Sequence, residues 1–177
     1  MTILPLMLIP DAVLRETAKP VKQITPAHKT LLKDMLETMY DAPGIGLAAN
    51  QIGSLERLIV MDCNPQDSEE QDPELGPYMM INPEIIWSSE EKNQYEEGCL
   101  SIPDGLGKVT RPAEVTVRYL DCEGNSCELQ ASGLLATCVQ HEIDHLNGVL
   151  FIDYLSKLKR DMISKKVKKY RQEREGR

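Results

Sequence analysis

Two histidines four residues apart, His141 and His145, with Glu142 beside the first, have the types and spacing best suited to chemistry in this chain. Side chains four apart on an α-helix share one face and lie about 6 Å apart along its axis, so both imidazoles can reach one metal ion. Glu142 lies at the edge of that face, within reach of a water on the metal. This His-Glu-x-x-His arrangement is typical of metal-dependent hydrolases, and the alternative is a chance match.

A catalytic metal site of this kind needs a third protein ligand and an open position for water. Downstream candidates are poor. Phe151 stands where one class of metalloproteases would have a third histidine, and Glu173 and Glu175 lie inside a basic tail. His28 is expected to be a surface histidine on the exposed side of an early helix. These positions argue against a peptidase that cuts internal bonds.

The best third ligand lies upstream, at Cys99. Gly98 gives this cysteine a flexible backbone approach, and Glu97 before it provides a polar setting. Burial is the usual fate of a free thiol, and we expect it for the other four cysteines: Cys63, Cys122, Cys127 and Cys138.

The metal-binding motif requires a helix, and the surrounding residues predict one over about 133–146. Ser132 can cap its start, and Asn147-Gly148 can end it. Asp144 points away from the histidine face, so we expect it to orient the helix or bind a neighbouring loop.

A second helix is predicted over 26–41, where Thr25-Pro26 is a strong start signal and leucine and methionine recur at helical spacing. Residues 44–51 follow as a glycine-bounded run of small residues. They lack the full phosphate-binding glycine pattern, but they let the backbone approach another strand or a bound peptide. Gln51 closes the run with a side-chain amide that can donate a hydrogen bond.

The remaining elements are strands, an extended N-terminal arm over 4–10 and a final helix. We expect strands at 58–61, 78–82, about 84–88, 115–119 and 126–131, an acidic loop at 64–77, and a helix at about 156–172. This order predicts an α+β fold, in which antiparallel β-sheets surround a central metal-binding helix, with further helices at the N- and C-terminal ends.

Composition indicates one globular domain over residues 1–177, with 41% hydrophobic and 27% charged residues. The five cysteines have no disulfide framework spacing, and neither a signal peptide nor a membrane span is recognisable, so a cytoplasmic location is expected. The net charge of −8 is uneven, because residues 157–177 carry ten basic and three acidic side chains. A polyanionic partner or a solvated amphipathic helix would each explain this tail.

Three stretches together resemble the signature motifs of the peptide deformylase family: GIGLAANQ at 44–51, EGCLS at 97–101 and QHEIDH at 140–145. They occur in the family's order, and the similarity extends to residues 10–15, 82–84 and 151–155. The chain is most similar to the bacterial class with a helical C-terminus.

The resemblance implies removal of the N-formyl group from the N-terminal formylmethionine of nascent polypeptides, releasing formate, by attack of a metal-bound hydroxide. It implies that Cys99, His141 and His145 bind the metal and that Glu142 is the general acid and base. The family's metal is usually Fe(II), for which Zn(II), Ni(II) or Co(II) may substitute. The Gln51 side chain and the Leu100 backbone N–H fit the role of oxyanion donors.

The resemblance also implies how the substrate binds. The peptide backbone would add alongside the 44–47 segment, and the methionine side chain would enter an apolar pocket that includes His141. We expect Glu97 to form an ion pair with Arg111. The expected substrate-binding residues are Gly44, Ile45, Gly46, Glu97, Gly98, Leu134 and Cys138, although Leu134 could equally be a core residue.

Four positions depart from the family's common residues. Thr137 replaces a commonly aliphatic residue at the pocket edge, and Tyr95, four residues before Cys99, also replaces a frequent aliphatic residue. Leu106 replaces an arginine found in some members, and Ala12 replaces a proline. Since the metal and catalytic positions are intact, these changes concern substrate preference and not the reaction.

The family's basic C-terminal helix docks near the ribosomal exit tunnel, so the ribosome is the expected partner of the tail, with rRNA phosphates as counter-charges. Neither a membrane nor DNA is expected as a partner. A ribosome-binding module without activity is a third alternative to the deformylase and the peptidase, and the presence of Glu142 and Gln51 argues against it.

Overall fold

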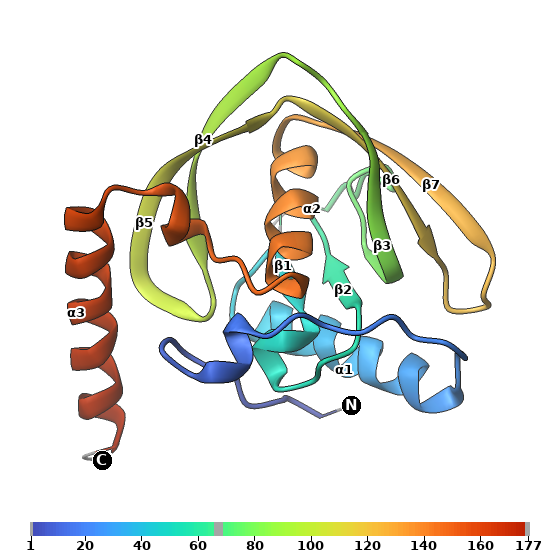
Figure 1. Cartoon of the computed structure of the whole chain (residues 1–177). Coiled ribbons are helices and arrows are strands. Elements are labelled where there is room, and N and C mark those ends of the chain that lie inside the picture. The colour runs from blue at the N-terminus through green and yellow to red at the C-terminus, as the bar shows by residue number, and fades with distance from the viewer. Residues whose placement is uncertain (1, 66–68, 176–177) are drawn as a thin grey trace.

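Helix α2 (Gly133–Leu146) is the centre of the fold in this computed structural model, which describes residues 2–65 and 69–175. Figure 1 shows the helix enclosed by strands, with β4 and β5 on one side and the larger sheet on the other. Eleven of its 14 residues are buried. The apolar first half of this helix requires a core around it, and the polar second half is buried through the contacts described below.

All strand pairs are antiparallel. The larger sheet has the order β1 (Gly46–Ala48), β2 (Leu58–Met61), β3 (Tyr78–Ser88), β6 (Glu114–Leu120) and β7 (Ser126–Ser132), and the smaller sheet pairs β4 (Lys92–Cys99) with β5 (Ile102–Pro112). The described residues also contain three short 3-10 helices: η1 (Ala12–Arg15), η2 (Ala49–Ile52) and η3 (Phe151–Tyr154). The predicted α+β class is confirmed.

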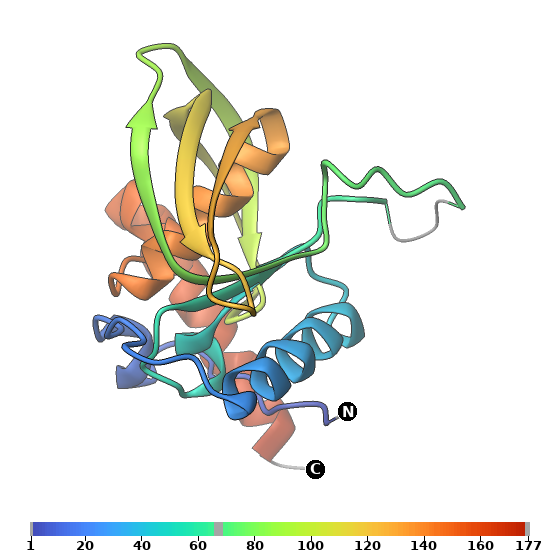
Figure 2. The same cartoon turned by 90° about the vertical axis from the view of Figure 1, so that its right-hand side faces the viewer.

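Helix α1 (Pro26–Asp41) has the predicted bounds and buries its predicted stripe, with Leu32, Met35 and Met39 fully inaccessible. Helix α2 also has its predicted bounds. Ser132 occupies its N-cap position, but the expected capping hydrogen bond from the Ser132 side chain is not formed. The predicted loop at 64–77 is free of helix and strand wherever it is described, and Figure 2 shows it extending away from the sheets.

The strands predicted at 58–61, 115–119 and 126–131 are confirmed as β2, β6 and β7, but the rest of the strand prediction was wrong. Residues 78–82 and 84–88 form one strand, β3, whose register shifts between Ile81 and Glu84, where Asn82 adopts φ +53°. Strands β4 and β5 were not expected. In β5, Gly107 stands where a side chain would signal a strand, because a Cβ there would lie 2.5 Å from Leu155 Cδ1. The close approach of Leu155, the residue after η3, therefore requires a glycine where an apolar side chain would otherwise indicate a strand.

The N-terminal arm lies against the body as expected and supports the two segments that carry Gln51 and Ser101. The Met7 N–H donates to the Gln51 carbonyl, and the Ile9 N–H donates to the Ser101 carbonyl. Of the cysteines expected to be buried, Cys63 and Cys138 are so, whereas Cys122 and Cys127 are only partly buried and that expectation was wrong for them. In the described residues, no helix is long and apolar enough to cross a membrane.

Helix α3 (Lys157–Glu175) is three residues longer at its C-terminal end than predicted and packs along β5. Ile163 and Val167 are its buried contacts, and the Arg171 guanidinium donates to the Leu8 and Ile9 carbonyls of the arm. The other basic side chains of α3 lie mainly on the outside. This helix therefore joins the core through a narrow apolar stripe and leaves its charge exposed.

Candidate metal centre and substrate cleft

Strand β4 and helix α2 face each other with matching side-chain spacing. Residues two apart on a strand repeat every ~6.6 Å on one face, and residues four apart on a helix repeat every ~6 Å. Glu97 therefore meets His141, and Cys99 meets His145. The register of β4 against β5 shifts between Glu97 and Cys99, so the match is approximate there, but it brings Cys99 to His145, 46 residues further along the chain.

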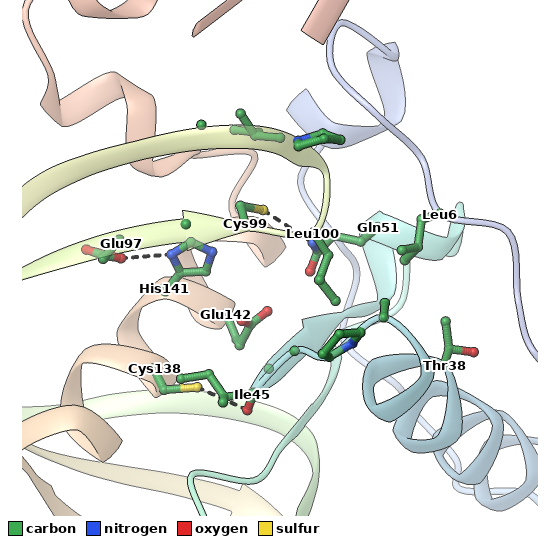
Figure 3. A pocket seen from close by; sticks show the side chains of 18 of the residues that line it. Leu6, Thr38, Ile45, Gln51, Glu97, Cys99, Leu100, Cys138, His141 and Glu142 are labelled. Atoms are coloured by element: carbon green, nitrogen blue, oxygen red, sulfur yellow. Dashed lines mark hydrogen bonds and ion pairs between the residues drawn. The ribbon is translucent and has the colours of Figure 1, made fainter. Parts of the chain in front are cut away.

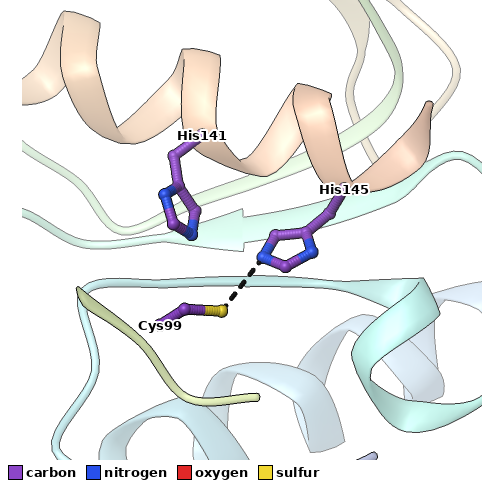
Figure 4. Close-up of side chains that lie close together, drawn as sticks. All are labelled: Cys99, His141 and His145. Atoms are coloured by element: carbon purple, nitrogen blue, oxygen red, sulfur yellow. Dashed lines mark hydrogen bonds between the residues drawn. The ribbon is translucent and has the colours of Figure 1, made fainter. Parts of the chain in front are cut away.

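The side chains of Cys99, His141 and His145 converge (Figure 4), with one ligand atom from each lying within 4.8 Å of the others. Cys99 Sγ lies 3.2 Å from His145 Nε2. A thiolate and two imidazoles suit Zn(II), Fe(II) and related ions, and three protein ligands are the number found in catalytic sites. The residues present therefore fit a metal ion at this position.

His141 is held by a chain of charged groups behind it. Its Nδ1 lies 2.8 Å from Glu97 Oε1, and Glu97 accepts two hydrogen bonds from Arg111, at 2.9 and 3.1 Å. The Glu97–Arg111 pair was predicted, but the contact with His141 was not. Arg111 also donates to Asp144, which accepts a hydrogen bond from Tyr154 as well. With Nδ1 engaged by a carboxylate, the ring presents Nε2 to the metal position.

The pKa values of the two buried imidazoles shift in opposite directions. Burial would lower the pKa of His141, but its hydrogen bonds to Cys99 and Glu97 outweigh burial and raise that pKa well above its usual value. The pKa of His145 is lowered well below its usual value by burial and by the charge on His141. Phe151 stacks on His141 with ring centroids 6.1 Å apart, so the residue that excluded a third histidine is a packing partner of the site.

Glu142 lies beside the metal position with no hydrogen-bond partner for its buried Oε2 among the described residues. Burial raises its pKa to about 7, although the charge on His141 acts in the opposite direction. Its carboxylate packs directly against the backbone of β1 at Gly46. A Cβ at this position would lie only 2.8 Å from Glu142 Cδ and still closer to Oε1, so a larger residue would not fit. Glycine at position 46 thus gives the carboxylate its place.

The Gln51 side chain is fixed at both ends. Its Oε1 accepts the Ala48 N–H at 2.9 Å, which directs Nε2 toward Ser101 Oγ at 3.1 Å and Cys99 Sγ at 3.4 Å. The amide N–H groups therefore point at the metal position and not away from it. Figure 3 shows Gln51 and Leu100 on one side of this position and Glu142 on another.

A cleft of about 1100 Å³ opens onto these residues. Among the residues predicted for the site, its lining includes Gly44, Ile45, Gly46, Gln51, Glu97, Gly98, Cys99, Leu100, Leu134, Cys138, His141 and Glu142. Leu134 is 44% exposed, which decides against its being a core residue. The N-terminal arm and the end of α3 also line the cleft, and no sequence pattern indicated either contribution. The predicted residues thus share one cavity, with His145 behind it.

His28 is remote from this chemistry. It is less exposed than expected, with 13% of its side chain accessible. Its Nδ1 accepts the Thr25 N–H at the start of α1, and its Nε2 donates to the Glu56 carboxylate. Within the described residues, the metal-ligand cluster contains His141 and His145 but not His28.

Comparison with known proteins gives one consistent result. The family described as Polypeptide deformylase matches residues 3–161. A peptide deformylase from Rhizobium meliloti (strain 1021) is 57% identical over 169 residues, which cover 96% of this chain and 94% of that protein. The crystal structure of peptide deformylase from Ehrlichia chaffeensis has a TM-score of 0.90 at 41% identity, covering 97% of this chain and 98% of that one. A second structure from the same organism, in complex with actinonin, also has a TM-score of 0.90, at 44% identity, covering 96% and 98%.

Proposed function

The chain belongs to the polypeptide deformylase family, metal-dependent hydrolases that remove the formyl group from N-formylmethionyl nascent peptides, and we propose that Cys99, His141 and His145 hold its metal. The observation that carries this proposal is the convergence of three ligand atoms beside the buried carboxylate of Glu142. Family membership also decides against the internal peptidase and the inactive ribosome-binding module.

Fe(II) is the metal we propose, with Zn(II), Ni(II) or Co(II) able to replace it, since all four accept thiolate and imidazole ligands. When bound, the ion supplies Lewis acidity that polarises the formyl group and makes water acidic enough to attack near neutral pH. The Cys99 thiolate reduces the charge of a divalent ion to a net +1. Glu97 keeps the second ring nitrogen of His141 occupied, so that the ring is held in one orientation.

Glu142 moves the proton in the proposed reaction. Its unpaired carboxylate accepts a proton as the water oxygen bonds to the formyl carbon, and it delivers that proton to the departing α-amine as the C–N bond breaks. The products are formate and a free amine. The pKa of about 7 that burial gives Glu142 suits both halves of this transfer.

The oxyanion that forms on the formyl oxygen needs donors that are already in place. We assign the Gln51 Nε2 amide and the Leu100 backbone N–H to this role. The Ala48 N–H fixes Gln51 before substrate arrives, and the oxyanion would replace the long hydrogen bond that Nε2 donates to Cys99 Sγ at 3.4 Å. Loss of one such donor typically costs about 10²–10³ in kcat.

The peptide would bind along β1, which is an edge strand of the larger sheet. An extended substrate can add to this edge through the 44–46 segment, while its first side chain enters the cleft. We assign Ile45, Leu134 and Cys138 to the walls of that side-chain pocket. The Cys138 thiol donates to the Ile45 carbonyl at 3.5 Å, which joins two of these walls.

For the rest of the molecule, we propose that residues 1–177 act as one catalytic domain in the cytoplasm and that α3 contacts the ribosome near the exit tunnel. The support for the contact is the exposed basic surface of α3 together with its firm attachment to β5. Ribosomal RNA phosphates would then supply the opposite charge.

The test is an anaerobic assay of the Fe(II)-loaded protein with formyl-Met-Ala-Ser. Formate and free α-amine should appear in equal amounts, with no free dipeptide. Release of dipeptide without formate would identify a peptidase instead. Absence of formate from protein with a measured full complement of Fe(II) would overturn the proposed function.

A further inference from the structure

The match between β4 and α2 continues one step beyond the metal centre. Tyr95 lies two residues before Glu97, and Thr137 lies four before His141, so the same spacing brings Tyr95 to the level of Thr137. The Tyr95 hydroxyl reaches across to this helix, 3.5 Å from where a Cβ on Gly133 would lie. Both side chains line the cleft.

The Thr137 hydroxyl differs from those of Thr30 and Thr38, the other threonines on the described helices. Thr30 and Thr38 donate to the carbonyls of Pro26 and Asp34, four residues back, as helical threonines commonly do. Thr137 makes no such bond, although only 6% of the residue is exposed. Across the described residues, neither its hydroxyl nor that of Tyr95 has a hydrogen-bond partner.

Two unpaired hydroxyls therefore stand in a wall whose neighbours are apolar or already engaged. Leu134 and Ile45 have no polar side-chain atoms, and the Cys138 thiol is committed to the Ile45 carbonyl. Among the described residues, neither hydroxyl belongs to the buried side-chain atoms that lack a partner, so both are open to water in the cleft. A bound group that accepts a hydrogen bond would replace that water, and the wall offers such a group two donors.

We propose that this pocket accepts formyl peptides whose first residue is methionine sulfoxide, with Thr137 as the donor to the sulfoxide oxygen and Tyr95 as a second donor beside it. The inference rests on the proposed deformylase function and specifies its substrate range. Methionine sulfoxide keeps the length of methionine and adds one strongly accepting oxygen. An all-aliphatic wall would leave this oxygen without a donor, which lowers affinity by the cost of one unmade hydrogen bond.

The experiment compares kcat/KM for formyl-Met-Ala-Ser and for the same peptide carrying methionine sulfoxide, using metal-loaded protein. Wild-type protein should hydrolyse the sulfoxide within about tenfold of the thioether. Thr137→Val keeps the shape but removes the hydroxyl, and it should lower the sulfoxide-to-thioether ratio about tenfold, the size of one hydrogen bond. Thr137→Ser keeps the hydroxyl and should retain the ratio, as should the remote Thr30→Val control.

Tyr95→Phe tests the second donor in the same way, and a fall of the ratio in either variant supports the proposal. An unchanged ratio in both Thr137→Val and Tyr95→Phe overturns it, provided that the thioether peptide is still hydrolysed. If wild-type protein fails on the thioether peptide itself, the proposed function has failed instead. The two failures are therefore distinguishable.

Discussion

The Glu97 carboxylate lies 2.8 Å from Nδ1 of His141 and is itself held by two hydrogen bonds from Arg111. One buried acid thus couples the proposed metal ligand His141 to the buried cation Arg111. These contacts lower the pKa of Glu97 even though burial, the largest single influence, acts to raise it. The imidazole orientation therefore depends on a charge network that extends through Arg111 to Asp144, three residues along the helix from His141.

Glu97→Gln should weaken metal binding about 10–100-fold, the usual cost of altering the group that orients a ligating histidine. It should also lower the free energy of unfolding, because the buried Arg111 would lose one of its two carboxylate partners and keep only Asp144. Competition with a chelator measures the first effect, and urea unfolding measures the second. Glu114→Gln, at an exposed position on β6, is the control. Equal metal affinity in both variants would remove Glu97 from its positioning role.

Gly46→Ala should leave the fold and the metal in place while lowering kcat about 100-fold. The new methyl group would displace the Glu142 carboxylate, and a displacement of about 1 Å at a reacting group has that cost. Metal content and thermal unfolding should be close to wild type, which separates displacement from damage to the fold. Wild-type kcat in this variant would show that Glu142 does not need its position against β1.

The raised pKa of Glu142 predicts a pH-dependent cost in the metal-free protein. Because the folded-state pKa of about 7 exceeds the ordinary value of 4.5, the carboxyl loses protons less readily when folded, so stability declines as pH rises between these values. Glu142→Gln removes the cost, and its advantage in unfolding free energy should grow by roughly 2–3 kcal/mol from pH 5 to pH 8. Urea unfolding at both pH values measures it. A constant difference would contradict the burial argument.

Charge reversal on α3 tests the ribosome contact better than deletion, because deletion would uncover the core contacts of Ile163 and Val167. Replacement of the exposed Lys165, Lys166 and Lys169 by glutamate should abolish salt-sensitive binding to purified ribosomes while leaving hydrolysis of short peptides intact. Sedimentation at two salt concentrations measures the binding.

The matched control reverses three exposed lysines elsewhere: Lys22, Lys33 and Lys92. This control variant has the same change in net charge, and it should bind ribosomes like wild type if α3 is the contact. Equal loss in both triple variants would mean that overall charge, and not α3, governs the association.

Local signals allowed parts of this structure to be predicted. Helices α1 and α2 have their predicted bounds, since their start signals, apolar spacing and C-terminal residues lie within a few positions of one another. The three motif stretches at 44–51, 97–101 and 140–145 also contain most of the predicted residues that line the cleft. Strands β4 and β5 escaped prediction, because β4 is polar along most of its length and Gly107 in β5 serves contact with η3.

The long-range contacts of the site were beyond local signals. Nothing near Phe151 in the sequence indicates that its ring stacks on His141, and nothing near Met7 indicates that the arm supports Gln51. Each contact depends on how β4, α2 and the arm pack together. The reactive side chains could be predicted from the sequence, whereas the residues that hold them in place could be found only from the structure.

The central claim is that Cys99, His141 and His145 hold the metal and that Glu142 moves the proton. The most direct measurement determines metal content and formate release together in wild type, Glu142→Gln and Cys99→Ala, with Cys127→Ala as the thiol control. We expect metal in wild type, Glu142→Gln and Cys127→Ala, but formate from wild type and Cys127→Ala alone. Cys99→Ala should hold no metal. Wild-type rates of formate release from either Glu142→Gln or metal-free Cys99→Ala would contradict the account.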